Sequence, residues 1–169
     1  DMMPAVTIRL SRGESVYTQS GGMSWMTEGV QMESNLKGGF GKAFGRMFSG
    51  ESLLMATFTA TRDVDEVTFA AAMPGKILKF DIQPNYEIIA QKGAFLCAEH
   101  GVQLSTYFNR GVKGGLFGGE GFILQKYSGS GSVFCEIDGS VETIDLAPGE
   151  LLRVDTGNIA AFETSVQYS

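Results

Sequence analysis

Histidine, cysteine and proline are scarce in this chain of 169 residues, which contains one, two and four of them respectively. A metal centre of the histidine-rich kind needs several histidines, so the sequence excludes one. Any serine or cysteine nucleophile would depend on the single His100. Because His100 lies between two strand-like runs, we expect it in a solvated turn and favour that position over a catalytic role.

The two cysteines, Cys97 and Cys135, are far apart and each lies in an apolar run. They form neither a zinc-binding nor a redox spacing. We expect two reduced, buried thiols, and a disulfide is the less favoured alternative.

Long apolar stretches and an excess of basic residues are also missing. No run of about 18 apolar residues predicts a membrane-spanning helix, and no basic segment followed by an apolar run predicts a signal peptide. We therefore expect a cytoplasmic protein. The formal net charge is −6 and the pI is about 4.8. This balance excludes a basic field over the whole surface and argues against nucleic-acid binding, although a local basic patch stays open.

Glycine, by contrast, is abundant, with 23 residues in the chain. Aromatic residues make up 11% of the sequence, which is too many for a disordered glycine-rich linker. Glycines among β-branched and aromatic residues are typical of short strands joined by tight turns. The composition therefore predicts an all-β protein.

An internal repeat supports this prediction. Residues 8–21, 80–93 and 144–157 each read as a short apolar-polar-apolar strand, a turn, a second strand and a glycine. The offsets between them are 72 and 64 residues. Alternation places one face of each strand on a core, and Pro-Asn or Pro-Gly supplies the turn, with positive φ accepted by Asn or Gly.

A second pair of segments, residues 48–55 and 117–124, matches at an offset of 69 residues. We predict a single β domain over residues 1–169 with pseudo-repeats at roughly 5–75 and 76–143. Residues 144–169 complete the fold and start a third copy. Short strands at regular spacing suggest a barrel or a sandwich.

Helical signals are few. Phe40, Phe44, Met47 and Phe48 have the spacing of one helical face, but the glycines among them weaken a helix. We expect one short helix or a compact glycine-rich loop there, with residues 105–121 as its counterpart.

Other chemical motifs are weak. Residues 38–42 and 111–115 contain glycine and lysine without the spacing of a phosphate-binding loop. Asp63, Asp65 and Glu66 read as a charged turn that lacks the pattern of a calcium-binding loop. Glu51 and Glu120 occupy the same place in the two halves and could do acid–base work, but we favour hydrogen bonds to their own turns. We predict no catalytic residues, no cofactor and no metal.

The most suggestive segment is residues 36–50, which has three basic residues, no acidic residue and several large apolar side chains. Such a segment suits intramolecular packing, a contact between subunits or a membrane surface. Aromatic and basic residues together could also stack single-stranded RNA. Including the counterpart in the second half, the candidate interaction residues are Lys37, Phe40, Lys42, Phe44, Arg46, Met47, Phe48, Arg110, Lys113 and Phe117.

Several motifs together resemble the AIM family, which is named for altered inheritance of mitochondria. They are Gly21-Gly22-Met23-Ser24-Trp25-Met26 and residues 45–52, with Phe117-Gly118-Gly119-Glu120-Gly121-Phe122 and Val154-Asp155-Thr156-Gly157 in the second part of the chain. The resemblance implies a double-stranded β-helix like that of the tryptophan RNA-binding attenuation protein. It also implies homo-oligomers in bacteria and a mitochondrial role in eukaryotic members. It carries no catalytic residues.

We therefore expect a non-enzymatic oligomeric scaffold or binding module. The alternatives are a peripheral membrane-associated organising factor and an RNA-binding regulator of the attenuation type. A shared fold by itself does not imply RNA binding, and the net charge of −6 argues further against it.

Overall fold

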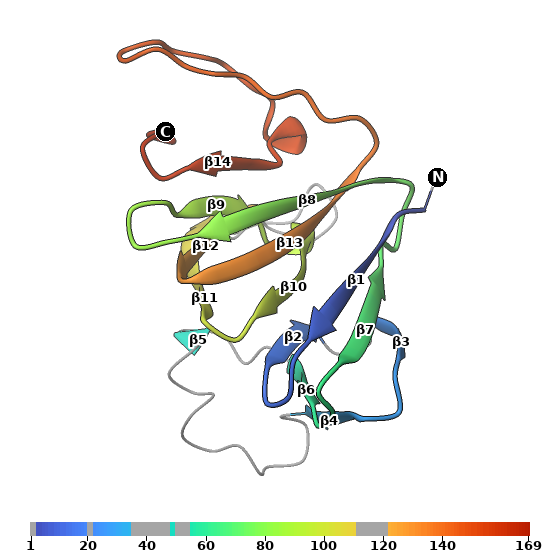
Figure 1. Cartoon of the computed structure of the whole chain (residues 1–169). Helices are drawn as coiled ribbons and strands as arrows, with labels where there is room; N and C mark the ends of the chain where they lie inside the picture. Colours follow the sequence, from blue (N-terminus) through green and yellow to red (C-terminus); the bar gives the residue numbers. More distant parts are fainter. Residues whose placement is uncertain (1–2, 20–21, 35–47, 50–54, 111–121) are drawn as a thin grey trace.

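The computed structural model describes residues 3–19, 22–34, 48–49, 55–110 and 122–169. Over these residues the protein is built from β-strands in three sheets, which confirms the predicted all-β class (Figure 1). The helical elements among the described residues are two single 3₁₀ turns, η3 (Lys92–Ala94) and η4 (Thr156–Asn158). The double-stranded β-helix itself stays a prediction.

The first sheet has three strands and the second has six. In spatial order the first sheet contains β1 (Ala5–Leu10), β7 (Asp65–Ala70) and β3 (Met23–Met26). The second contains β4 (Val30–Ser34), β6 (Met55–Ala60), β2 (Ser15–Gln19), β10 (Phe95–Glu99), β13 (Gly131–Asp138) and β8 (Gly75–Ile82).

The third sheet has five strands, and its fifth is short. In order they are β14 (Ala161–Glu163), β9 (Ile88–Gln91), β12 (Phe122–Gly129), β11 (Val102–Arg110) and β5 (Phe48–Ser49). Strand β5 runs parallel to β11, whereas the other described ladders are antiparallel.

Two hydrophobic cores lie on either side of the six-stranded sheet. Successive side chains of a strand point to opposite faces, so Val16 joins the core shared with the first sheet and Tyr17 the core shared with the third. Both side chains are buried. This double packing explains why β2 and β6 are buried almost throughout, whereas the edge strand β1 alternates between exposed and half-buried positions.

The turn chemistry is confirmed in two of the three repeated segments and differs in the third. Gly13 follows β1 with a φ of 84°, and Gly149 has a φ of 80°. Asn85, however, keeps a negative φ, because the turn after β8 is closed by Gln83 and Tyr86 without a left-handed residue. The expectation that asparagine would adopt positive φ is therefore wrong at this position.

Two further expectations need correction. Residues 105–110 are not part of a helix or a compact loop, because they continue β11 and pair with β12. Residues 144–157 contain the expected turn but not the two expected strands, since the described chain offers their backbone no neighbouring ladder. The expected helix or loop at residues 36–50 lies outside the described residues, apart from residues 48–49 in β5.

Candidate functional site

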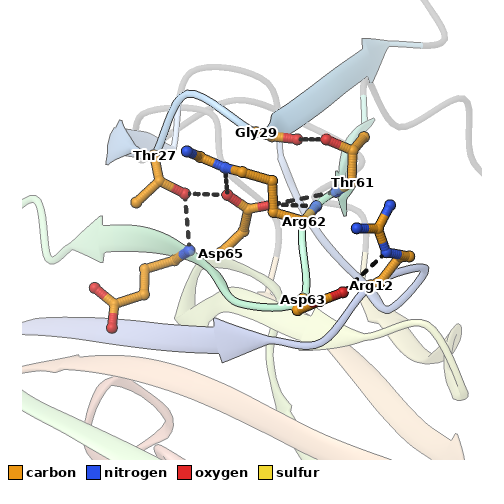
Figure 2. Close-up of polar contacts among 8 residues, drawn as sticks. Arg12, Thr27, Gly29, Thr61, Arg62, Asp63 and Asp65 are labelled. Carbon is orange, nitrogen blue, oxygen red and sulfur yellow. Dashed lines mark hydrogen bonds and ion pairs between the residues drawn. The ribbon is translucent and has the colours of Figure 1, made fainter.

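A polar cluster around Asp65 joins the turn between β3 and β4 to the turn between β6 and β7. Asp65 is fully buried at the start of β7. Figure 2 shows the carboxylate accepting a hydrogen bond from the Thr27 hydroxyl at 2.6 Å. It also accepts bonds from the backbone amides of Thr61 and Arg62, at 3.2 and 2.9 Å, and from the Arg62 guanidinium at 3.2 Å. The cluster holds the two turns together.

The same contacts set the charge of Asp65. The Thr27 hydroxyl, which outweighs the opposing effect of burial, acts with the backbone and guanidinium of Arg62 to lower the pKa of Asp65 to about 2. Both carboxylate oxygens already accept hydrogen bonds from protein donors. A carboxylate with so low a pKa and such saturated oxygens is a poor general base, because it has little affinity for a proton. Asp65 therefore acts as a structural brace.

This arrangement predicts a specific pH dependence for an Asp65→Asn variant. The folded-state pKa lies below the ordinary value, so the carboxylate contributes stability that is fully present above about pH 4 and is lost as the pH falls towards 2. The gap in urea-unfolding free energy between wild type and variant should be constant from pH 5 to 7 and should narrow below pH 4. A gap that stays constant at acid pH would show that Asp65 is not held ionised by the fold.

The expected charged turn is only partly correct. Asp63 and Glu66 are exposed, and Asp63 forms an ion pair with Arg12 at 3.1 Å in which both side chains are well exposed. Such a surface pair contributes little to stability. Asp65 is the exception, because four hydrogen-bond donors from the folded structure compensate for its burial. Among the described residues, no group of three or more potential ligands is placed to hold a metal ion.

The candidate nucleophiles also lack an activated environment. Cys97 and Cys135 are free thiols and both are fully buried, as expected from the sequence. Burial raises the pKa of Cys97, and it raises the pKa of Cys135 to about 12 even though the neighbouring Tyr127 hydroxyl acts in the opposite direction. A thiol that stays protonated is a weak nucleophile. His100 is exposed in the turn between β10 and β11, as expected.

Most of the sequence-predicted interaction residues lie outside the described parts of the chain. Phe48 and Arg110 are described only as backbone, in β5 and β11 respectively, and the two segments come together because β5 pairs with β11. Glu51 and Glu120 also fall outside the described residues. The others outside them are Lys37, Phe40, Lys42, Phe44, Arg46, Met47, Lys113 and Phe117.

A cluster of five aromatic rings lies on the third sheet, and we call it the aromatic cluster. Tyr168 is its centre, with ring centroids 5.3 Å from Phe108, 5.8 Å from Phe122 and 6.1 Å from Phe162. Tyr107 joins through Phe162 at 6.5 Å. Tyr107 is 44% exposed and the other four rings are half-buried. The cluster therefore forms an apolar surface that the described residues cover incompletely.

A β-bulge allows two neighbouring residues to contribute to the aromatic cluster. In a regular strand the side chains of Tyr107 and Phe108 would point to opposite faces. The register of β11 against β12 shifts between Thr106 and Phe108, which makes Tyr107 the extra residue. Bulges re-aim side chains and are frequent next to functional sites. Here the bulge brings both rings to the same cluster.

Sequence reasoning missed the aromatic cluster. Phe108 and Phe122 border residues 111–121, so the aromatic flanks of this segment were a visible signal. Phe162 and Tyr168, however, reach the cluster only because β14 pairs with β9 at the edge of the third sheet. A pairing between such distant segments cannot be read from local patterns.

Comparisons with known proteins agree with the fold. A family model described as mitochondrial biogenesis AIM24 matches residues 1–169. An uncharacterized protein of Streptococcus pyogenes serotype M6 is 30% identical over 174 residues, covering 98% of this chain and 68% of the relative. A crystal structure of another Streptococcus pyogenes protein matches with a TM-score of 0.76 at 26% identity, covering 97% of this chain and 73% of that one.

These relatives assign no activity to the chain. None of the helices in the described residues is long and apolar enough to cross a membrane. The match over the whole length, together with the resemblance noted in the sequence, identifies the family. The chain belongs to the mitochondrial biogenesis AIM24 family.

Proposed function

We propose that this protein is a non-enzymatic β scaffold that associates with further copies of itself through the aromatic cluster. The observation that carries this proposal is the set of five rings around Tyr168, which remains half-exposed on the third sheet. Interfaces between protein subunits are enriched in tyrosine and phenylalanine, and their centres are depleted of charged residues. Tyr107, the most exposed ring, has the character of an anchor residue.

The chemistry of the described residues supports a binding role over catalysis. The buried carboxylate of Asp65 is saturated by hydrogen bonds, and burial raises the pKa of both thiols. These are the properties of groups that stabilise a fold, because a catalytic group needs a pKa near the working pH and access to substrate.

The net charge disfavours partners that would be bound mainly through attraction to basic residues. The net charge of −6 opposes approach to RNA or to anionic lipid. Attraction between aromatic surfaces needs no net charge, because removal of apolar area from water drives it. The membrane-associated factor and the RNA-binding regulator remain the two competing functions.

Light scattering of the native protein at micromolar concentration tests the proposal. We expect a mass that is a multiple of 18.1 kDa for the wild type. In Tyr107→Asp a charge is placed at the contact, and we expect at least a tenfold weaker association. Met32→Asp is the matched control, because Met32 is 54% exposed on β4, away from the cluster.

Three results would contradict the proposal. The first is a wild-type mass of 18.1 kDa at all concentrations. The second is equal weakening of association by the Tyr107 and Met32 substitutions. The third is flotation with anionic vesicles, or binding of single-stranded RNA that weakens steeply with salt, by a protein that stays monomeric.

A further inference from the structure

Residues 140–155 form an arm that extends away from the three sheets (Figure 1). The chain reverses at its tip, where the Glu150 amide donates to the Ala147 carbonyl at 2.9 Å. In the described part of the chain, no backbone hydrogen bond joins residues 151–154 to another strand. Leu151 is 93% exposed, and Leu152 and Val154 are more than two-fifths exposed. Extended, unpaired backbone with apolar side chains is a strand without a partner.

Strand β3 is an edge strand, and within the described part of the chain one side of its backbone is free to pair. It is the last strand of the first sheet, and β7 is the one strand of the described residues that pairs with it. Trp25 on β3 is 61% exposed and Met26 is 37% exposed. An edge with large apolar side chains is a template for a further strand.

Two ladders already present in the protein show how such an edge is covered. Strand β2 pairs with β10 so that Thr18 lies opposite Cys97, and β9 pairs with β14 so that Ala90 lies opposite Ala161. Residues 18 and 90 are 72 apart and residues 97 and 161 are 64 apart. These separations equal the two offsets of the repeated segments in the sequence. The two ladders are therefore equivalent: each joins one strand unit to the next unit along the chain in the same register.

The remaining ladders follow the same rule. In the first unit β7 lies between β1 and β3, and in the second unit β13 lies between β8 and β10. Likewise β6 lies between β4 and β2, and β12 lies between β11 and β9. In a third unit the two halves of the arm correspond to β8 and β9 of the second unit. Strand β14 then corresponds to β10 of the second unit and to β3 of the first.

The corner that leads out of the arm repeats the corner after β9. Gln91 before η3 has φ and ψ of −60° and 143°, and Asp155 before η4 has −63° and 134°. After the two 3₁₀ turns, Phe95 has −65° and 122°, and Ile159 has −82° and 115°. The chain therefore turns from the arm into β14 as it turns from β9 into β10.

From these equivalences we propose that residues 151–155 bind the free edge of β3 in the same chain, as an antiparallel strand with Val154 opposite Trp25 and Leu152 opposite Thr27. The pairing closes the series of strand units. The first unit pairs its β2 with β10 of the second, the second pairs its β9 with β14 of the third, and the third would pair residues 151–155 with β3 of the first. It covers exposed apolar side chains on both partners. Both existing ladders of this kind join parts of one chain. In the structure the arm and β3 lie apart (Figure 1), so the pairing requires the arm to move towards β3. The proposal is independent of self-association through the aromatic cluster.

The single tryptophan of the chain provides the test, because Trp25 lies on the edge in question. We expect wild-type Trp25 emission to be blue-shifted and weakly quenched by acrylamide at all protein concentrations. Val154→Pro removes an amide and cannot add to a ladder, so the emission should move to that of an exposed indole. Ile144→Pro is the matched control, since Ile144 is 59% exposed on the same arm but lies outside the proposed ladder. Circular dichroism confirms that both variants keep the three sheets.

Each other outcome overturns the proposal. An exposed-indole spectrum in the wild type means that the edge is open. A blue-shifted spectrum that Val154→Pro leaves unchanged means that another group covers Trp25. A blue shift that appears only at high protein concentration assigns the edge to a second copy of the chain.

Discussion

Replacing Phe69 by alanine is expected to lower the free energy of unfolding by about 3–5 kcal/mol, the range for a phenylalanine removed from a packed core. Phe69 is fully buried near the end of β7, the middle strand of the first sheet. Its ring packs edge-to-face on Phe58 of the second sheet, with centroids 5.7 Å apart. The substitution removes this contact and leaves a cavity between the two sheets. Urea unfolding followed by circular dichroism measures the loss.

A matched control is Val64→Ala, because Val64 is 50% exposed in the turn just before β7. Its effect should stay within about 0.5 kcal/mol, as for ordinary surface substitutions. If Phe69→Ala lowered the free energy of unfolding no more than the control does, the first sheet could not pack on the second as described.

The second large effect is expected at Gly75, where β8 begins. A Cβ atom there would lie 1.9 Å from the Ile137 carbonyl oxygen and 2.9 Å from the Gly139 amide nitrogen. Both are backbone atoms of the facing chain at β13, so no side-chain rotation relieves the clash. We expect Gly75→Ala to destabilise by about 3 kcal/mol, at the upper end of the usual cost of overpacking. Thermal or urea unfolding measures this change.

Gly93→Ala separates this steric effect from a general effect of replacing glycine. No atom lies within 4 Å of a Cβ built at Gly93, and its φ is not in the left-handed region. Alanine there should be neutral or stabilising by up to about 1 kcal/mol, because it reduces the entropy of the unfolded chain. Equal destabilisation by the two substitutions would contradict the register of β8 against β13.

The strand units could be predicted from the sequence because their information is local. Apolar and polar residues alternate through residues 8–10 and 80–82, and a turn follows each run; both runs form the ends of strands, β1 and β8. The same reasoning failed at residues 144–157. Alternation predicts which residues can form a strand, but a strand also needs a paired backbone, and residues 151–154 are not paired with any strand in the described part of the chain.

The site was harder to predict because it depends on contacts between distant segments. Asp65 reads as one of three acidic residues in a turn, and only the approach of Thr27 from another turn explains why it is buried. The aromatic cluster needs the bulge at Tyr107 and the return of Tyr168 to the third sheet. Neither event leaves a local pattern in the sequence.

The central claim is that the aromatic cluster is a contact between copies of this chain, and oxidative footprinting of Tyr107 tests it most directly. Hydroxyl radicals modify side chains that water can reach, and Tyr107 is 44% exposed in the single chain. As the protein concentration rises through the range of association, modification of Tyr107 should fall severalfold, while that of Met32, which is 54% exposed, stays constant. Modification of Tyr107 that does not change while the native mass increases would contradict the account, because the copies would then meet through another surface.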